Sequence, residues 1–260
     1  MATVISIAAQ KGGTGKSTTT ASLGVGLARL GKRVLLCDMD PQHSLSVSLG
    51  IQKPGTLPVT MATIMGNIVN DTEFDPVAGI IHHKEGIDFL PANISLAGME
   101  LSLVSVMGRE SITSQYIDKV GDKYDFIILD TAPSLGLLTI NALASSDFVI
   151  VPVAPKFLDV KGLELLLKSI SQVRQKINPR LSIGGILFTL VDKRANFTRE
   201  IIGLIETTYG GKIRIFSEHI PRSVRTAESS AHGKSIYSYD PHGKVAAAYA
   251  AFTREVLEIA

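Results

Sequence analysis

The sequence of 260 residues contains a single cysteine, Cys37. One cysteine cannot form an internal disulfide or supply the several thiolates of a zinc or iron–sulfur site, and this scarcity suits a reducing compartment. Long apolar runs are missing too: none reaches the ~18 residues of a membrane-spanning helix, because Ser, Asp or Asn interrupts each candidate. Residues 1–9 show neither the basic segment nor the cleavage-type site of a secretory signal. We therefore expect a cytoplasmic protein that does not span a membrane.

The sequence also has no low-complexity segment and no internal repeat. Hydrophobic residues make up 45% of the chain and charged residues 19%, which is enough apolar material for a sizeable core and argues against disorder. The net charge of +2 is unevenly placed. Residues 1–155 carry 10 Lys and Arg against 14 Asp and Glu, a net −4, whereas residues 156–260 carry 16 against 10, a net +6. The basic half indicates a polyanionic partner, and the alternative is a solvated surface with a chance asymmetry.

Short β-branched runs alternate with longer helical patterns along the chain. We predict strands over residues 3–8, 33–37, 124–129, 147–153, 181–190 and 212–216. We predict helices over residues 16–30, 135–144, 158–177, 197–208 and 245–259. Several strand segments are almost continuously apolar, as strands buried on both faces are. The alternation predicts an α/β protein, a mostly parallel sheet with helices on both faces, formed as a single domain over residues 1–260. Residues 51–86 are expected to be an excursion of loops and short helices.

The strongest functional signal is a glycine-rich turn between the first predicted strand and helix, Gln10-Lys11-Gly12-Gly13-Thr14-Gly15-Lys16-Ser17-Thr18. Its glycines let backbone N–H groups approach phosphate oxygens, and the helix start adds oriented donors and a favourable dipole. Lys16 supplies a positive charge for the terminal phosphates, and the Ser17 hydroxyl can ligate magnesium. The turn predicts the phosphate loop of a P-loop nucleotide-binding protein that also binds Mg²⁺; the resemblance described below implies that the nucleotide is ATP. It departs from the standard G-x-x-x-x-G-K-[ST] pattern because Gln10 stands where the first glycine is expected.

Two aspartates follow predicted strands at the edge where ligands bind in open α/β sheets. Asp130 comes directly after the strand 124–129 and can hold magnesium, usually through water. The alternative is a helix N-cap before Pro133. Asp40 follows the second predicted strand, where the alternative is an Asp-Pro turn.

With its extra lysine, Lys11, the loop resembles the deviant Walker A box of the ParA/MinD family of ATPases. Cys37-Asp38-Met39-Asp40-Pro41-Gln42 is similar to the family's first switch, and residues 127–133 to its Walker B strand and second switch. Residues 220–228, 232–234 and 239–241 resemble the C-terminal part of the ParA branch of Soj type. The resemblance covers most of the chain, but residues 51–123 only loosely.

The resemblance implies roles for single residues. Asp40 orients or activates the attacking water. Lys11 reaches the nucleotide of the facing subunit in a homodimer that ATP closes, where its charge can act as an arginine finger does. Without such a dimer Lys11 is a solvated loop lysine. Pro221 and Ser223 match family positions near the adenine.

Three arginines of the basic half, Arg194, Arg222 and Arg225, are the candidate DNA-binding residues. In the Soj-type branch, arginines that match Arg194 and Arg225 contact DNA phosphates, and such contacts carry affinity without sequence preference. The alternative is that all three are ordinary surface arginines.

Taken as a whole, the resemblance implies a ParA-like partition ATPase, nucleoid-associated in the cytoplasm. Its ATP-bound dimer binds non-specific DNA and is released by hydrolysis that a ParB-like partner stimulates, so that plasmid or chromosomal DNA is segregated. Two other hypotheses stay open. A MinD-type spatial regulator would end in a basic amphipathic helix at a membrane, unlike the Ala-rich residues 244–260. A metabolic ATP-dependent ligase of the same fold would need a substrate pocket that the sequence does not locate.

Overall fold

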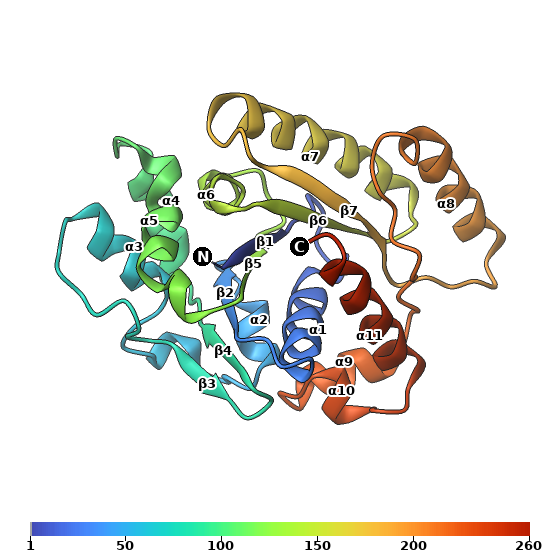
Figure 1. The fold of residues 1–260 in the computed structure, drawn as a ribbon, viewed down its shortest axis with the longest axis horizontal. Helices are drawn as coiled ribbons and strands as arrows, with labels where there is room; N and C mark the ends of the chain where they lie inside the picture. The colour runs from blue at the N-terminus through green and yellow to red at the C-terminus, as the bar shows by residue number, and fades with distance from the viewer. Residues whose placement is uncertain (1) are drawn as a thin grey trace.

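A seven-stranded sheet runs through the centre of the protein, whose computed structural model describes residues 2–260 (Figure 1). The strands lie in the order β3-β4-β2-β5-β1-β6-β7, and β3 is antiparallel to β4 whereas the other neighbours are parallel. Their bounds are β1 (Thr3–Ile7), β2 (Val34–Met39), β3 (Ile81–His83), β4 (Ile87–Leu90), β5 (Phe126–Thr131), β6 (Phe148–Val153) and β7 (Ser182–Phe188). The predicted α/β class is confirmed.

Helices cover both faces of the sheet, as continuously apolar strands require. One face packs against α1 (Lys16–Arg29) and α11 (Lys244–Leu257), with α2 (Ser44–Ser48) and α10 (Ile236–Tyr239) beside them. The other face packs against α3 (Met61–Val69), α4 (Ser95–Leu103), α5 (Ile112–Val120) and α6 (Leu137–Ser145), and further along against α7 (Phe157–Lys176) and α8 (Asn196–Tyr209). Helix α9 (Val224–Ala231) and the short 3₁₀ helices at Pro54–Thr56, Arg109–Ser111 and Gly121–Lys123 complete these elements.

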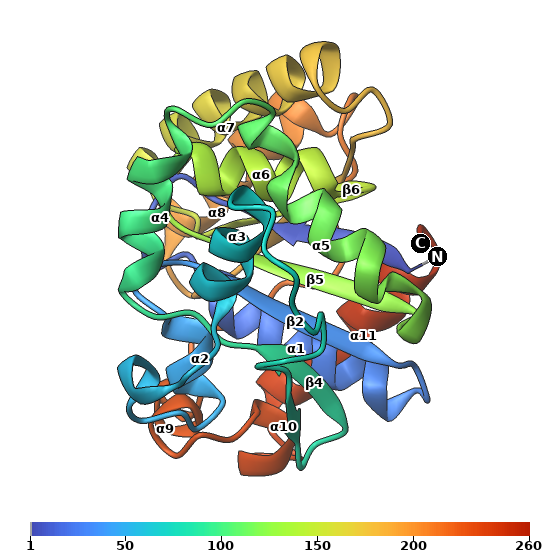
Figure 2. The ribbon, with the colours of Figure 1, turned by 90° about the vertical axis from the view of Figure 1, so that its left-hand side faces the viewer.

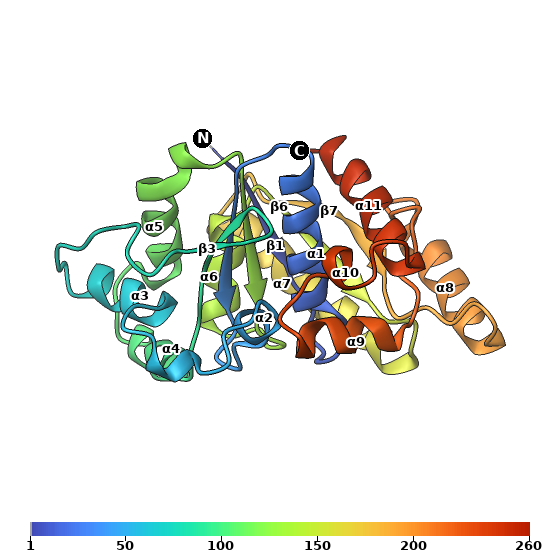
Figure 3. The same cartoon turned by 90° about the horizontal axis from the view of Figure 1, so that it is seen from below.

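The central strands are buried at every position of β2, β5 and β6, so any polar group within them needs a specific partner. The register places Ile7 and Asp38 beside Asp130 on the neighbouring strands. The carboxyl ends of β1, β2 and β5 therefore reach the same edge. Figures 2 and 3 show α2, α4 and α9 at that edge of the molecule. It is the edge at which open parallel sheets place their ligands.

Most predicted elements form within a few residues of the expected bounds. We predict none of β4, α2, α4, α5, α9 and α10 from the sequence, and two predicted regions differ from the structure. Residues 212–216 form no strand: Ile215 makes an isolated bridge to Ile186, because only two backbone hydrogen bonds, Ile186 N to Arg214 O at 2.9 Å and Phe216 N to Ile186 O at 3.0 Å, join the segments. The expected excursion at residues 51–86 contains α3 but also β3, which pairs with β4 as a hairpin at the sheet edge. A strand of three residues carries too little periodicity to be read from sequence.

Candidate functional site

The loop between β1 and α1 has the geometry of a phosphate cradle. Gly13 and Gly15 take φ values of 74° and 82°, a left-handed conformation that side chains other than glycine rarely adopt. Gly15 occupies the N-cap of α1 without a side-chain cap, and its carbonyl accepts the Thr19 N–H at 2.8 Å. The first N–H groups of α1 thus keep no capping partner within the helix, which is the arrangement that binds anions.

Lys16 opens α1 and points into a confined setting, since its residue is only 7% exposed. Burial lowers the pKa of the Lys16 ammonium, and the charges of Asp130 and Asp40 act in the opposite direction. A buried cation at the start of a helix needs an anion in contact with it. A terminal phosphate at the same helix end supplies that anion.

Asp130 lies on β5 below the loop and is fully buried. Its Oδ1 accepts the Thr20 hydroxyl at 3.2 Å, whereas Oδ2 has no hydrogen-bond partner within residues 2–260. Burial, and then the charge of Asp38, raise the pKa of the Asp130 carboxyl, and the nearby Ser17 hydroxyl and then the charge of Lys16 oppose them. A buried carboxylate with one unsatisfied oxygen fits a cation or a cation-bound water.

The donor set fits Mg²⁺ rather than a cage made by the protein alone. Among residues 2–260 no group of three or more His, Cys, Asp or Glu side chains is placed to share a metal ion. Mg²⁺ is ordinarily held by one or two protein oxygens together with substrate phosphates and waters. Ser17, next to Lys16, and the free oxygen of Asp130 match that requirement.

The segment after β2 is held by Asp38. Its carboxylate accepts the Asp40 N–H at 3.1 Å, and the Ser46 N–H and hydroxyl at 2.9 and 2.7 Å. Asp40 accepts the Gln42 N–H at 2.9 Å and is 6% exposed at the wall of the cavity. His43, with a left-handed φ of 47°, starts α2. Asp38 therefore shapes the segment, and Asp40 is the carboxylate that it presents.

The phosphate loop and Asp40 line one cavity of about 610 Å³ at the carboxyl edge of the sheet, whereas Asp38 and Asp130 are not among its lining residues. Its lining residues are Gly12, Gly13, Gly15, Lys16, Ser17, Thr18, Asp40, Gln42, Ser44, Val47, Ser48, Pro133, Ser230 and Ala231. Lys11 is not among them: its Nζ lies 2.8 Å from Oδ1 of Asp159, in the first turn of α7. Pro221 and Ser223, which the resemblance places near the adenine, do not line this cavity either, so the structure brings together residues 12–18 and Asp40 but not these three.

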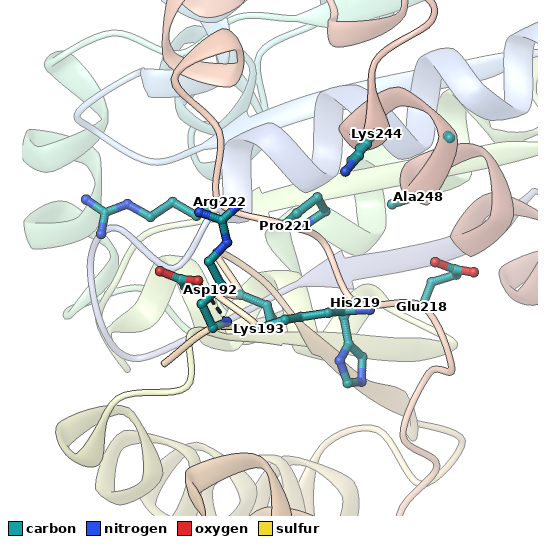
Figure 4. A pocket seen from close by; sticks show the side chains of 11 residues that line it. Asp192, Lys193, Glu218, His219, Pro221, Arg222, Lys244 and Ala248 are labelled. Atoms are coloured by element: carbon teal, nitrogen blue, oxygen red, sulfur yellow. Dashed lines mark hydrogen bonds between the residues drawn. The ribbon is translucent and has the colours of Figure 1, made fainter. Parts of the chain in front are cut away.

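A second, basic hollow of about 720 Å³ lies beside the end of β7 (Figure 4). It is lined by Val191, Asp192, Lys193, Arg194, Glu218, His219, Pro221, Arg222, Lys244, Ala247 and Ala248. Four cationic side chains thus face two acidic ones, and burial lowers the pKa of His219. Figure 4 shows Lys193, Arg222 and Lys244 around this hollow, which joins three segments distant in sequence.

The predicted residues of the basic half divide between this hollow and its surroundings. Arg194, Arg222 and Pro221 line the basic hollow, whereas Arg225 lies outside it, exposed at the start of α9 with Nη1 3.2 Å from Oε2 of Glu228. Ser223 caps α9 by accepting the Arg225 N–H at 3.2 Å. Sequence reasoning missed Lys193 and Lys244. Lys193 had the signal of adjoining Arg194, but Lys244 stands fifty residues away with no motif around it.

Two contacts link the cavity to the basic half. The Thr189 hydroxyl, at the end of β7, donates to the Thr14 carbonyl of the phosphate loop at 2.7 Å. Only Leu190, with a left-handed φ of 53°, separates Thr189 from the wall of the basic hollow. On the other side, Gly50 after α2 touches Gly233 after α9, where an added Cβ on Gly233 would lie 2.5 Å from the Gly50 Cα. The two regions are therefore in direct contact at both places.

Within residues 2–260 no helix is both long enough and apolar enough to cross a bilayer.

Comparisons with known proteins agree with this geometry. A family profile described as "AAA domain" matches residues 2–183. The sporulation initiation inhibitor protein Soj of Bacillus subtilis is 40% identical over 258 residues, 98% of either chain. The chromosome partitioning protein ParA of Myxococcus xanthus is 36% identical over 257 residues, 98% of this chain and 88% of that one. A structure described as cobyrinic acid a,c-diamide synthase from Mycobacterium smegmatis, with bound ATP analog and magnesium, superposes with a TM-score of 0.86 at 35% identity, over 99% of this chain and 95% of that one.

Proposed function

The chain belongs to the ParA/Soj family of P-loop ATPases, and from this premise we propose that it is a partition ATPase that hydrolyses ATP and segregates DNA. The observation that carries the proposal is the cavity lined by the buried Lys16 and the uncapped start of α1, with the buried Asp130, one of whose oxygens is unsatisfied, near enough for its charge to act on Lys16. We further propose that residues 1–260 act as one ATPase domain.

The residues of the cavity divide the work of phosphoryl transfer. Backbone N–H groups of residues 12–18 and the Lys16 ammonium bind the phosphate oxygens and hold the terminal phosphate in place. Ser17 and Asp130 would hold Mg²⁺, which neutralises charge on the phosphates when it is bound. Asp40, fixed through Asp38 and buried at the cavity wall, orients the attacking water.

Lys11 belongs to the same chemistry in a second copy of the chain. In the proposed ATP-bound homodimer, its ammonium faces the nucleotide of the partner and adds charge where the transition state develops it. Each nucleotide then touches both chains, so ATP favours the dimer and hydrolysis releases it.

The basic hollow and α9 supply the DNA-binding face. Arg194, Arg222 and Arg225, joined by Lys193 and Lys244, can neutralise backbone phosphates without reading bases. Dimerisation doubles this surface and so makes DNA affinity depend on ATP. A ParB-like activator, stimulating hydrolysis, completes the cycle of a cytoplasmic, nucleoid-associated protein.

The test measures binding to a random-sequence duplex by fluorescence anisotropy without nucleotide, with ADP and with a slowly hydrolysed ATP analogue, at 50 and 200 mM salt. If two of these five cations per subunit contact phosphates, the affinity should fall roughly a hundredfold between these salt concentrations, and each further contact steepens the loss. Arg225→Glu should abolish ATP-specific binding. Arg174→Glu, an exposed arginine near the far end of α7, is the matched control and should behave as wild type. Equal binding in every nucleotide state, or none with ATPase activity intact, would overturn the DNA-binding function.

The likeness to the structure described as a cobyrinic acid a,c-diamide synthase favours a second candidate, an ATP-dependent synthase. Such an enzyme turns over ATP only with its small-molecule substrate and has no need of the basic hollow. ATP hydrolysis stimulated by cobyrinic acid with an amide donor, but not by DNA and a ParB-like protein, would favour this candidate.

A further inference from the structure

The Lys11–Asp159 pair joins a residue of the phosphate loop to a carboxylate that the sequence did not single out. The two side chains meet at 2.8 Å between Nζ and Oδ1, as an ion pair without the angle of a hydrogen bond. Lys11 is partly exposed, whereas the Asp159 residue is only 5% exposed. No other ion pair involves either residue within the described part of the chain.

Because Asp159 is buried, its ion pair with Lys11 contributes to its stability. A carboxylate removed from water needs a cation or several donors, and breaking a buried pair by taking one partner away is strongly unfavourable. Asp159 sits in the first turn of α7, where the helix start offers partial compensation. Lys11 supplies the only full opposite charge that contacts it in the described residues.

Gln10, the residue before Lys11, also packs against α7. A Cβ added to Gly162 would lie 3.7 Å from the Gln10 Cβ, and Gln10, Lys11, Asp159 and Gly162 enclose a gap of only about 10 Å³. The Gln10 Oε1 is buried there without a hydrogen-bond partner in the described chain. The first two residues of the loop, including the one that replaces the expected glycine, thus lie directly on the first turns of α7.

We propose that Asp159 is a positioning residue that holds Lys11 within its own chain and sets the ATP concentration at which two copies associate. The inference rests on the proposed function, in which Lys11 reaches the partner's nucleotide. In this proposal, Lys11 turns away from α7 to reach a phosphate of the other subunit, and so exchanges Asp159 for that phosphate. Dimerisation therefore leaves Asp159 without its cation. The phosphates of the partner's nucleotide must compete with Asp159 for the Lys11 ammonium.

Asp159→Asn tests the proposal because it keeps the shape of the side chain and removes its charge. The variant should reach half-maximal dimer at about tenfold lower concentration of a slowly hydrolysed ATP analogue, measured by light scattering at fixed protein concentration. Asp159→Glu, which keeps the charge, should stay close to wild type. Glu164→Gln removes an exposed charge from the same helix and is the matched control. Thermal melting checks that each variant folds.

Two further measurements separate a release of Lys11 from a looser structure. Lys11 should react faster with an acylating reagent in Asp159→Asn than in wild type without nucleotide, as read by mass spectrometry. The double variant Lys11→Ala/Asp159→Asn should lose the gain in dimerisation. An unchanged or weakened dimer in the folded Asp159→Asn variant would overturn the inference. If wild type itself forms no ATP-dependent dimer, the proposed function fails, whereas the Lys11 labelling still shows whether Asp159 holds the lysine.

Discussion

The nucleotide cavity and the basic hollow lie on either side of the end of β7, yet they are built differently. The cavity takes most of its lining from two short segments, residues 12–18 and 40–48. The basic hollow gathers residues 191–194, 218–222 and 244–248, which meet only in the fold. A site built from consecutive residues can be recognised as a motif in the sequence. A surface built from segments that meet only in the fold shows in the sequence only as an excess of basic residues.

The two regions also differ in how much each side chain matters. Lys16, which lines the cavity, and Asp130, whose charge acts on it, are both buried, and burial shifts the pKa of each away from its ordinary value. In the hollow, Lys193, Arg194, Arg222 and Lys244 are exposed to solvent. We therefore expect single substitutions in the cavity to abolish activity, and those in the hollow to have graded, salt-dependent effects.

The largest effect is expected for Lys16→Ala. Removing a buried charge that pairs with phosphate, and leaving Asp130 and Asp40 without their cation, should weaken ATP binding on the order of a thousandfold. Titration with a fluorescent ATP analogue measures this directly. Lys32→Ala, which removes an exposed lysine after the same helix, is the control. ATP affinity within a few-fold of wild type would show that the charge of Lys16 is not what binds the phosphates.

Asp40→Ala should separate binding from turnover within the cavity. ATP should still bind and close the dimer, while the hydrolysis rate falls by about a hundredfold because the attacking water loses its orienting carboxylate. Phosphate release under single-turnover conditions gives the rate, and light scattering gives the dimer. A normal rate of phosphate release would exclude Asp40 from this role.

Lys244→Ala probes the region that the sequence did not reveal. Each dimer would lose two phosphate contacts, so the slope of log affinity for DNA against log salt should fall by about 1.8 and the affinity at moderate salt by about tenfold. Basal ATP hydrolysis should not change. Lys176→Ala, at the exposed end of α7, serves as the comparison, and equal salt slopes for the two variants would remove Lys244 from the DNA-binding face.

Thr189→Val should have the smallest effect, because it touches only the link between the two regions. The change keeps the shape of a buried side chain and deletes its 2.7 Å hydrogen bond to the Thr14 carbonyl. We expect the free energy of unfolding to fall by about 1 kcal/mol. The preference of DNA for the ATP-bound over the ADP-bound protein should fall about threefold. Denaturant unfolding and anisotropy measure the two quantities, and an unchanged preference would mean that the regions communicate by another route.

Much of the fold followed from the sequence because its central strands are buried on both faces and therefore nearly continuous in apolar residues. The hairpin of β3 and β4 did not, since its strands are short and lie at the sheet edge, where pairing rather than composition decides the structure. In the site, Lys16 and Asp130 could be predicted from the sequence, because Lys16 follows the glycine-rich turn and Asp130 follows the predicted strand 124–129. Asp159 carried none: an acidic residue in the first turn of a helix is ordinary, and only the fold brings it to Lys11.

The contact between Gly50 and Gly233 bears on how such a molecule can diverge. Because main chain meets main chain there, the separation of α9 from the segment that carries Asp40 is set by atoms that every residue possesses. Substitutions of the arginines and lysines around α9 can raise or lower the affinity of the proposed face for a polyanion without moving the backbone of that face. A side chain at Gly233 would instead press on the Gly50 main chain, because its Cβ would lie 2.5 Å from the Gly50 Cα. If the proposed DNA-binding face is correct, its affinity is open to gradual adjustment by mutation, whereas its distance from the Asp40 segment is set by a contact between main chains.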